Sequence, residues 1–217
     1  MNKEIIRQYL AEFVGTFALV FCGTGAIIIN EVTQGAITHV GIAITFGFII
    51  MSMIYTFGTI SGAHFNPAVT IAFTVAKLFK PSLVLPYILS QIAGGVVASL
   101  MLKVLFPMNQ TLGATLPAGS DMQSFILEII LTFFLMLVIL SVSQGSKEQG
   151  MFAGLAIGGT VLLDAMFGGP VSGASMNPAR SLAPALVTMN LQHLWLYLVA
   201  PVCGSLLALA VWKLTHR

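Results

Sequence analysis

The chain has 217 residues, of which nine are Lys or Arg, seven are Asp or Glu and four are His. Charged residues make up 7% of it and apolar residues 57%, whereas an ordinary soluble domain is about 25% charged. So few charges cannot cover a soluble surface, which excludes a cytosolic enzyme and a disordered protein. A net charge of +2 supplies no basic patch for nucleic acid. The composition predicts an integral membrane protein.

Six apolar windows are long enough to cross a lipid bilayer as helices, which takes about 20 residues each. In chain order they are residues 6–29, 37–60, 83–106, 124–143, 151–170 and 194–214. Two further apolar stretches, 67–79 and 178–189, begin with Pro and are too short to cross. No small-residue cleavage site follows the N-terminal segment, so we expect a retained helix there. Cys22 and Cys203 have no metal-ligand spacing, and we expect no metal site or disulfide framework.

The basic residues predict an orientation in the membrane. Seven of the nine fall in segments that six crossings place on one side, namely Lys3, Arg7, Lys77, Lys80, Lys147, Lys213 and Arg217. By the positive-inside rule this side is cytoplasmic. We therefore expect a multi-pass protein of the cell membrane, inner or plasma, with both termini in the cytoplasm. The two exceptions are Lys103 and Arg180.

The two halves of the chain resemble each other. SGAHFNPAVT at 61–70 recurs as SGASMNPARS at 172–181, and Glu12 in the first window matches Glu128 in the fourth. The sequence thus predicts a single transmembrane domain over 1–217, with one repeat at about 1–108 and the other at about 120–217. Each repeat has three crossings, so the second is inverted. Inverted repeats with short interrupted helices indicate a site at the middle of the bilayer.

Each repeat contains an Asn-Pro-Ala motif at the start of its short apolar stretch. Asn is a favoured helix N-cap and Pro a favoured first helical residue, so each motif predicts the start of a half-helix. The two N-termini meet from opposite sides, and their positive ends repel cations, including hydrated protons. The Asn side chains can direct their NH₂ groups at a passing solute. The motif residues are Asn66, Pro67 and Ala68, and Asn177, Pro178 and Ala179.

The irregular segments before the two motifs expose backbone carbonyls. Non-helical backbone at membrane depth persists only where it is buried or lines a wet cavity. The expected carbonyls belong to Gly62, Ala63, His64, Phe65, Gly173 and Ser175. A row of acceptors with two central donors suits water and small neutral solutes that pass in single file. We therefore expect a passive channel that uses no cofactor.

With these two motifs, each preceded by Ser-Gly-Ala, the sequence resembles the aquaporin (major intrinsic protein) family over essentially its whole length. The strings GTISGAHFNPAVT and GGPVSGASMNPARSLAPA look most like the nodulin-like intrinsic proteins of plants and their bacterial relatives. The resemblance implies an all-α fold of six tilted transmembrane helices plus two half-helices, and a homotetramer with one pore per subunit. For the nodulin-like branch it implies passage of glycerol and of boric, silicic or arsenous acid.

The resemblance also implies an outer constriction at Arg180. In the family this Arg acts with three other positions, which fall here on Phe46, Ala165 and Ala174. Water-selective members carry an aromatic residue, a His and a small residue or Cys there, and glycerol facilitators carry Trp, Gly and Phe. This chain follows neither pattern, and its two alanines predict a wider opening than a water-only pore has. The alternatives are a strictly water-selective channel and an Arg180 side chain that extends to the membrane interface instead.

Three acidic residues lie inside the predicted spans. Glu12 and Glu128 occupy equivalent places in the repeat, and scaffolding of the irregular segments is favoured over a proton relay, because intramembrane carboxylates need buried partners. His64 is likewise interpreted as a brace rather than a pH gate. For Asp164, beside Ala165, we hypothesise a structural role, to be checked by unchanged permeability in Asp164→Asn.

Two other classes of protein remain open from the sequence. An ion-coupled transporter also has inverted repeats and broken helices, but only Asp164 and the two Glu could supply its ion site. A structural membrane protein with a vestigial pore does not need both motif asparagines and Arg180, and the short loops offer it little adhesive surface.

Overall fold

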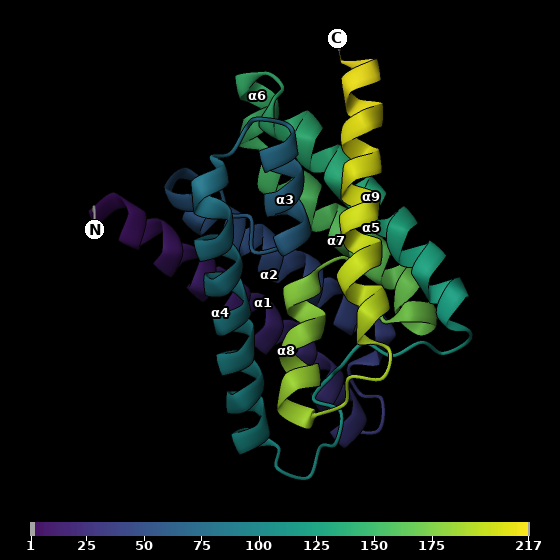
Figure 1. Cartoon of the computed structure of the whole chain (residues 1–217). Coiled ribbons are helices and arrows are strands. Elements are labelled where there is room, and N and C mark those ends of the chain that lie inside the picture. Colours follow the sequence, from purple (N-terminus) through teal and green to yellow (C-terminus); the bar gives the residue numbers. More distant parts are fainter. Residues whose placement is uncertain (1–2, 217) are drawn as a thin grey trace.

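The computed structural model describes residues 3–216, and the regular elements of this range are all helical (Figure 1). Six of them are long and apolar enough to cross a membrane. These are α1 (Lys3–Val32), α2 (Thr38–Ser61), α4 (Val84–Leu105), α5 (Asp121–Ser143), α7 (Ala153–Ser172) and α9 (Leu194–Thr215). The prediction of six spans is confirmed, with helix ends that differ by a few residues from the windows. Arg217, one of the basic residues of the orientation argument, lies outside the described residues.

Two short helices complete the predicted set. α3 (Pro67–Val75) has nine residues and α8 (Pro178–Thr188) has eleven, so neither can cross a bilayer. Figure 1 shows them one above the other near the middle of the molecule, each reaching toward a different end. The expected fold of six spans and two half-helices is confirmed.

Two short elements lie in segments that the sequence predicts to be connections. A 3₁₀ turn, η1 (Pro81–Leu83), precedes α4, and a one-turn helix, α6 (Lys147–Met151), joins α5 to α7. The Ser146 hydroxyl accepts from the backbone of Gln149, whose side chain accepts from the backbone of Ser146 in return. This reciprocal cap stabilises a helix that has no apolar periodicity.

The long helices pack in two matching groups. α1 contacts α2 and α4, α5 contacts α7 and α9, and α2 joins the groups through α7. Glycines allow the closest approaches: a side chain at Gly94 of α4 would strike the backbone of Phe13 in α1, and one at Gly204 of α9 would strike the backbone of Ile129 in α5. Such small-residue contacts are typical of helices packed in lipid.

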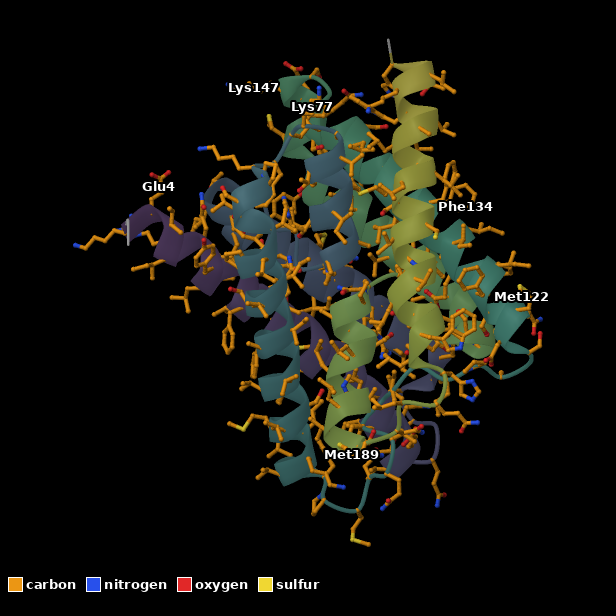
Figure 2. All side chains as sticks on the ribbon, in the orientation of Figure 1. Glu4, Lys77, Met122, Phe134, Lys147 and Met189 are labelled. Atoms are coloured by element: carbon orange, nitrogen blue, oxygen red, sulfur yellow. The ribbon has the colours of Figure 1, made fainter. Side chains whose placement is uncertain are left out.

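The molecule has a basic end and an apolar outer surface. Figure 2 shows Lys77 and Lys147 at the end where α9 also terminates, here termed the basic end, and Met189 at the opposite end. Between the ends, apolar side chains such as Phe134 point outward, and this ring is 49% exposed. An exposed apolar surface of this kind fits contact with lipid or with other protein chains.

Candidate functional site

A buried carboxylate holds the irregular segment before α3. Glu12 of α1 is fully buried, and its Oε1 accepts from the Ser61 hydroxyl at 2.7 Å and from the His64 N–H at 2.9 Å. Its Oε2 accepts from the Phe65 N–H at 2.7 Å and from the Gln91 side chain at 2.8 Å. The four donors tie α1 and α4 to a backbone segment that forms no regular structure.

The second half repeats this arrangement. Glu128 of α5 is also fully buried, and its Oε1 accepts from the Ser172 hydroxyl at 2.7 Å and from the Ser175 N–H at 2.8 Å. Its Oε2 accepts from the Met176 N–H at 2.8 Å. The place of Gln91 is taken by Pro201 (91 + 110 = 201), which has no side-chain donor. Three donors instead of four therefore hold the second segment.

These segments adopt left-handed backbone conformations at residues other than glycine. The φ angles are 51° at Ala63, 50° at Phe65, 42° at Ala174 and 52° at Met176. Such a conformation costs an L-residue roughly 1–2 kcal/mol. The carboxylates offset part of this cost because they accept the N–H groups of Phe65 and Met176. The left-handed turns direct the carbonyls of the same two residues toward the opposite half of the molecule.

The asparagine oxygens cap the two short helices as predicted. Asn66 Oδ1 accepts from the Ala68 N–H at 2.9 Å, and Asn177 Oδ1 accepts from the Ala179 N–H at 3.0 Å and the Arg180 N–H at 3.3 Å. Pro67 and Pro178 occupy the first helical positions, and both motif alanines are completely buried.

The asparagine nitrogens bind across the centre. Asn66 Nδ2 donates to the Met176 carbonyl at 2.7 Å, and Asn177 Nδ2 donates to the Phe65 carbonyl at 2.8 Å. The sequence predicts NH₂ groups directed at a passing solute, but each amide uses one N–H for a carbonyl of the opposite half. Because a carboxamide has two N–H groups, one per asparagine remains for a passing molecule. These two hydrogen bonds also join the two halves of the molecule at its centre.

A cavity of about 460 Å³ runs past both asparagines and Arg180. Its wall includes most of the residues that the sequence interpretation assigned to a pore, namely Phe46, Gly62, Ala63, His64, Ala165, Ala174 and Ser175. Toward the α6 segment it continues between Tyr55, Ser143 and Met151, which the sequence did not indicate. One continuous cavity thus contains the motif asparagines and the residues of the expected constriction.

Two of the expected carbonyl positions lie outside the cavity wall. Phe65 is 1% exposed, and its carbonyl is turned toward Asn177. Gly173 packs against Thr115, since a Cβ atom on it would approach Thr115 Cγ2 to 3.0 Å. The Phe65 carbonyl thus has one protein donor, and the assignment of pore carbonyls to Phe65 and Gly173 stays a prediction.

Arg180 is held within the protein and does not extend to the membrane interface. Its side chain is 2% exposed, and its Nη1 donates to the Gly113 carbonyl at 2.9 Å. Its guanidinium carbon lies 5.3 Å from the centre of the Phe46 ring, within cation–π range. Ala165 and Ala174 share the same cavity wall.

The connection between α4 and α5 supplies the acceptor for Arg180, which sequence reasoning missed. Asn109 Oδ1 accepts from the Leu112 N–H at 2.7 Å, and Leu112 is completely buried. Gly113 has a φ of 67°, and a Cβ atom on it would approach Thr24 Cβ to 2.7 Å. Any residue has a backbone carbonyl, so the sequence cannot mark the one that accepts from Arg180. The signals for an ordered turn at this place are the Asn and Gly residues of the long connection.

His64 and Asp164 occupy different surroundings. The Nδ1 atom of His64 lies 3.0 Å from the Thr70 hydroxyl, and its ring stacks on Phe73 with 5.0 Å between centres. Asp164 is 8% exposed and is not among the residues of the cavity wall, although the adjacent Ala165 is. Its Oδ2 has no hydrogen-bond partner within residues 3–216. The structural role of Asp164 stays a prediction.

Comparison with known proteins identifies this arrangement. A family model described as Major intrinsic protein matches residues 1–212. The chain belongs to the major intrinsic protein family. Members of this family are membrane channels rather than enzymes, and this chain is a channel for water and small uncharged solutes.

Individual relatives confirm the nodulin-like resemblance. Nodulin-26 from Glycine max is 45% identical over 217 residues, which cover 100% of this chain and 80% of that protein. Aquaporin NIP1-1 from Oryza sativa subsp. japonica is 46% identical over 205 residues, covering 94% and 72% respectively. The X-ray structure of the aquaglyceroporin from Plasmodium falciparum is 25% identical, with a TM-score of 0.88 and coverage of 98% of this chain and 97% of that one.

Proposed function

We propose that this major intrinsic protein passes glycerol and other small polyols together with water, and that Phe46, Ala165, Ala174 and Arg180 form its selective constriction. The observation that carries the proposal is the pair of alanines on the same cavity wall as Arg180 and Phe46. Methyl groups there leave room that an imidazole would fill. The carbon atoms of a polyol can pass along the Phe46 ring while its hydroxyls bind the guanidinium.

Boric, silicic and arsenous acids belong to the same proposed solute class, because they are small, neutral and rich in hydroxyl groups. The resemblance to nodulin-like relatives supports their inclusion. Each can exchange hydrogen bonds between the carbonyls of the cavity wall and the remaining N–H groups of Asn66 and Asn177.

The proposed channel excludes ions and protons. The N-termini of α3 and α8, each with roughly half a positive charge, point toward the centre of the cavity. Arg180 adds a full positive charge beside the same cavity. Cations are repelled by these charges, and anions lose their hydration against a largely apolar wall.

We also propose the assembly and orientation that the sequence predicts. Four copies form a homotetramer with one pore per subunit, supported by family membership and by the exposed apolar outer surface. The protein lies in the cell membrane with its basic end, and hence both termini, in the cytoplasm.

Stopped-flow light scattering on proteoliposomes tests the solute proposal. Wild-type vesicles are expected to swell quickly with water and with glycerol, whereas Ala165→His keeps water permeability and loses most glycerol permeability. Ala165→Ser is the matched control, because it adds a hydroxyl with little bulk and is expected to pass glycerol as the wild type does.

Other outcomes separate the alternatives. Fast water without glycerol flux above that of empty liposomes would show a strictly water-selective channel. Solute uptake driven by a proton gradient or by voltage would show an ion-coupled transporter instead.

A further inference from the structure

Gly23, in the middle of α1, lies where a side chain would meet the Phe46 ring. A Cβ atom added to Gly23 would lie within 2.6 Å of the ring atoms Cδ1, Cε1 and Cζ of Phe46. A glycine inside a helix is destabilising relative to alanine by about 1 kcal/mol. The edge of the Phe46 ring thus occupies the volume that the side chain of residue 23 would fill.

The Phe46 ring also borders the cavity. It is 8% exposed, it forms part of the cavity wall, and the Arg180 guanidinium carbon lies 5.3 Å from its centre. The ring therefore lies between α1 and the open cavity. How far it extends into the cavity depends on how closely it can approach α1.

The backbone of α2 cannot move away to accommodate a larger residue 23. Gly47, next to Phe46, packs so closely on α7 that a Cβ atom on it would lie 2.6 Å from both the Gly158 carbonyl oxygen and Leu162 Cβ. A Cβ atom added to Gly158 of α7 would in turn lie 2.7 Å from Met51 Cβ of α2. Because α2 is fixed against α7, a ring pushed from α1 must turn about its own side-chain bonds toward the cavity.

We propose that Gly23 is a specificity-determining positioning residue: the absence of its side chain lets Phe46 lie against α1 and keeps the constriction wide enough for polyols. This inference rests on the proposed constriction and adds to it a residue that does not touch the solute. A methyl group at position 23 moves the ring toward Arg180 and narrows the opening. Glycerol is affected far more than water because it is wider.

The test compares Gly23→Ala with Gly25→Ala in proteoliposomes. Gly25 is on the same helix, and a Cβ atom on it would meet Leu102 Cδ2 at 3.4 Å, an ordinary contact. Gly23→Ala is expected to lower glycerol permeability about tenfold, equivalent to about 1.4 kcal/mol of barrier, with water permeability changed far less. Gly25→Ala is expected to keep both permeabilities.

The same substitution in a Phe46→Ala background shows whether the ring transmits the effect. With no ring to displace, Gly23→Ala is expected to leave glycerol permeability equal to that of Phe46→Ala alone. An unchanged glycerol-to-water ratio in Gly23→Ala would overturn the proposal, as would an equal loss in the Phe46→Ala background. A Gly23→Ala protein that assembles only when Phe46 is also shortened would overturn it too, since the ring would then have no room to move.

A failure of the polyol proposal can be told apart from a failure of the Gly23 proposal. If the wild type passes water and no glycerol, the polyol proposal is wrong, and water permeability decides the role of Gly23. A drop in Gly23→Ala that disappears in the Phe46→Ala background would support the positioning role. Unchanged water permeability would overturn it.

Discussion

The two buried carboxylates differ in one partner, the side chain of Gln91. Glu12 accepts from the Gln91 side chain in addition to the irregular segment, whereas Glu128 has Pro201 at the matching place. The first segment is also tied to α3, because His64 Nδ1 lies 3.0 Å from the Thr70 hydroxyl, and the second is tied to α8 by a hydrogen bond between the Ser175 and Ser181 hydroxyls. Each segment is therefore tied to its short helix as well as to its carboxylate, and we expect both carboxylates to stabilise the fold.

Glu128→Gln is expected to lower the thermal stability of the protein. The substitution replaces one acceptor oxygen by an NH₂ group, although the Ser172 hydroxyl and the N–H groups of Ser175 and Met176 all need acceptors there. A buried donor without an acceptor costs about 1–3 kcal/mol. The measurement is the midpoint of thermal unfolding in detergent. The exposed Glu148→Gln serves as the control, and equal midpoints for the two variants would contradict the scaffold role.

At the scale of single residues, the sequence predicts side-chain roles better than backbone contacts. The capping by Asn66 and Asn177 follows from residue type and from the Pro that comes next. That each amide donates to a carbonyl of the other half depends on how the halves meet. The bond from Asn177 to the Phe65 carbonyl has no signature in the sequence, because a left-handed turn directs that carbonyl.

Among the helices, α7 contains a break in its hydrogen bonding that a neighbouring helix repairs. Pro170 lies inside α7 and has no N–H to donate to the carbonyl of Met166, four residues earlier. His39 of α2 fills this vacancy, because its Nε2 lies 2.8 Å from the Met166 carbonyl oxygen. The imidazole ring also packs over Gly169, where a Cβ atom would approach its Nε2 to 3.3 Å.

A double-mutant cycle tests this repair. His39→Phe keeps a ring but removes the donor, and we expect it to destabilise the protein by about 1 kcal/mol. In a Pro170→Ala background the new N–H restores the helical bond to the Met166 carbonyl, so His39→Phe should cost much less. The unfolding free energies of the four proteins in mixed micelles give the coupling. A cost of His39→Phe that is the same in both backgrounds would show that the bond contributes nothing.

For the helices, hydropathy predicts which segments cross the membrane but not where each helix ends. All six spans follow from length and apolar content, because the bilayer selects for both. The helix ends do not follow: α1 continues through Asn30 and Glu31 to Val32, beyond the apolar window. The one-turn helix α6 was not expected because polar capping by Ser146, rather than burial, stabilises it.

For the whole molecule, charge and topology give one consistent arrangement. The even number of spans puts both ends of the described chain on one side, and Lys77 and Lys147 lie at that basic end in Figure 2. Arg180 is a basic residue that does not lie at the basic end. Its side chain donates a hydrogen bond to the Gly113 carbonyl beside the cavity. Its exception to the positive-inside rule is therefore explained by its contacts in the site.

Cysteine labelling on intact cells tests the proposed orientation. In a background with Cys22 and Cys203 replaced by Ala, Gln149→Cys places a thiol in α6 at the basic end, and Gln192→Cys places one before α9 at the opposite end. Both glutamines are exposed, so both thiols can be reached from the solvent. A charged maleimide, which neither lipid nor the proposed pore passes, is expected to label Gln192→Cys on intact cells and Gln149→Cys only after permeabilisation. The reverse pattern would invert the orientation, and labelling of both thiols on intact cells would contradict an odd number of crossings between these two positions.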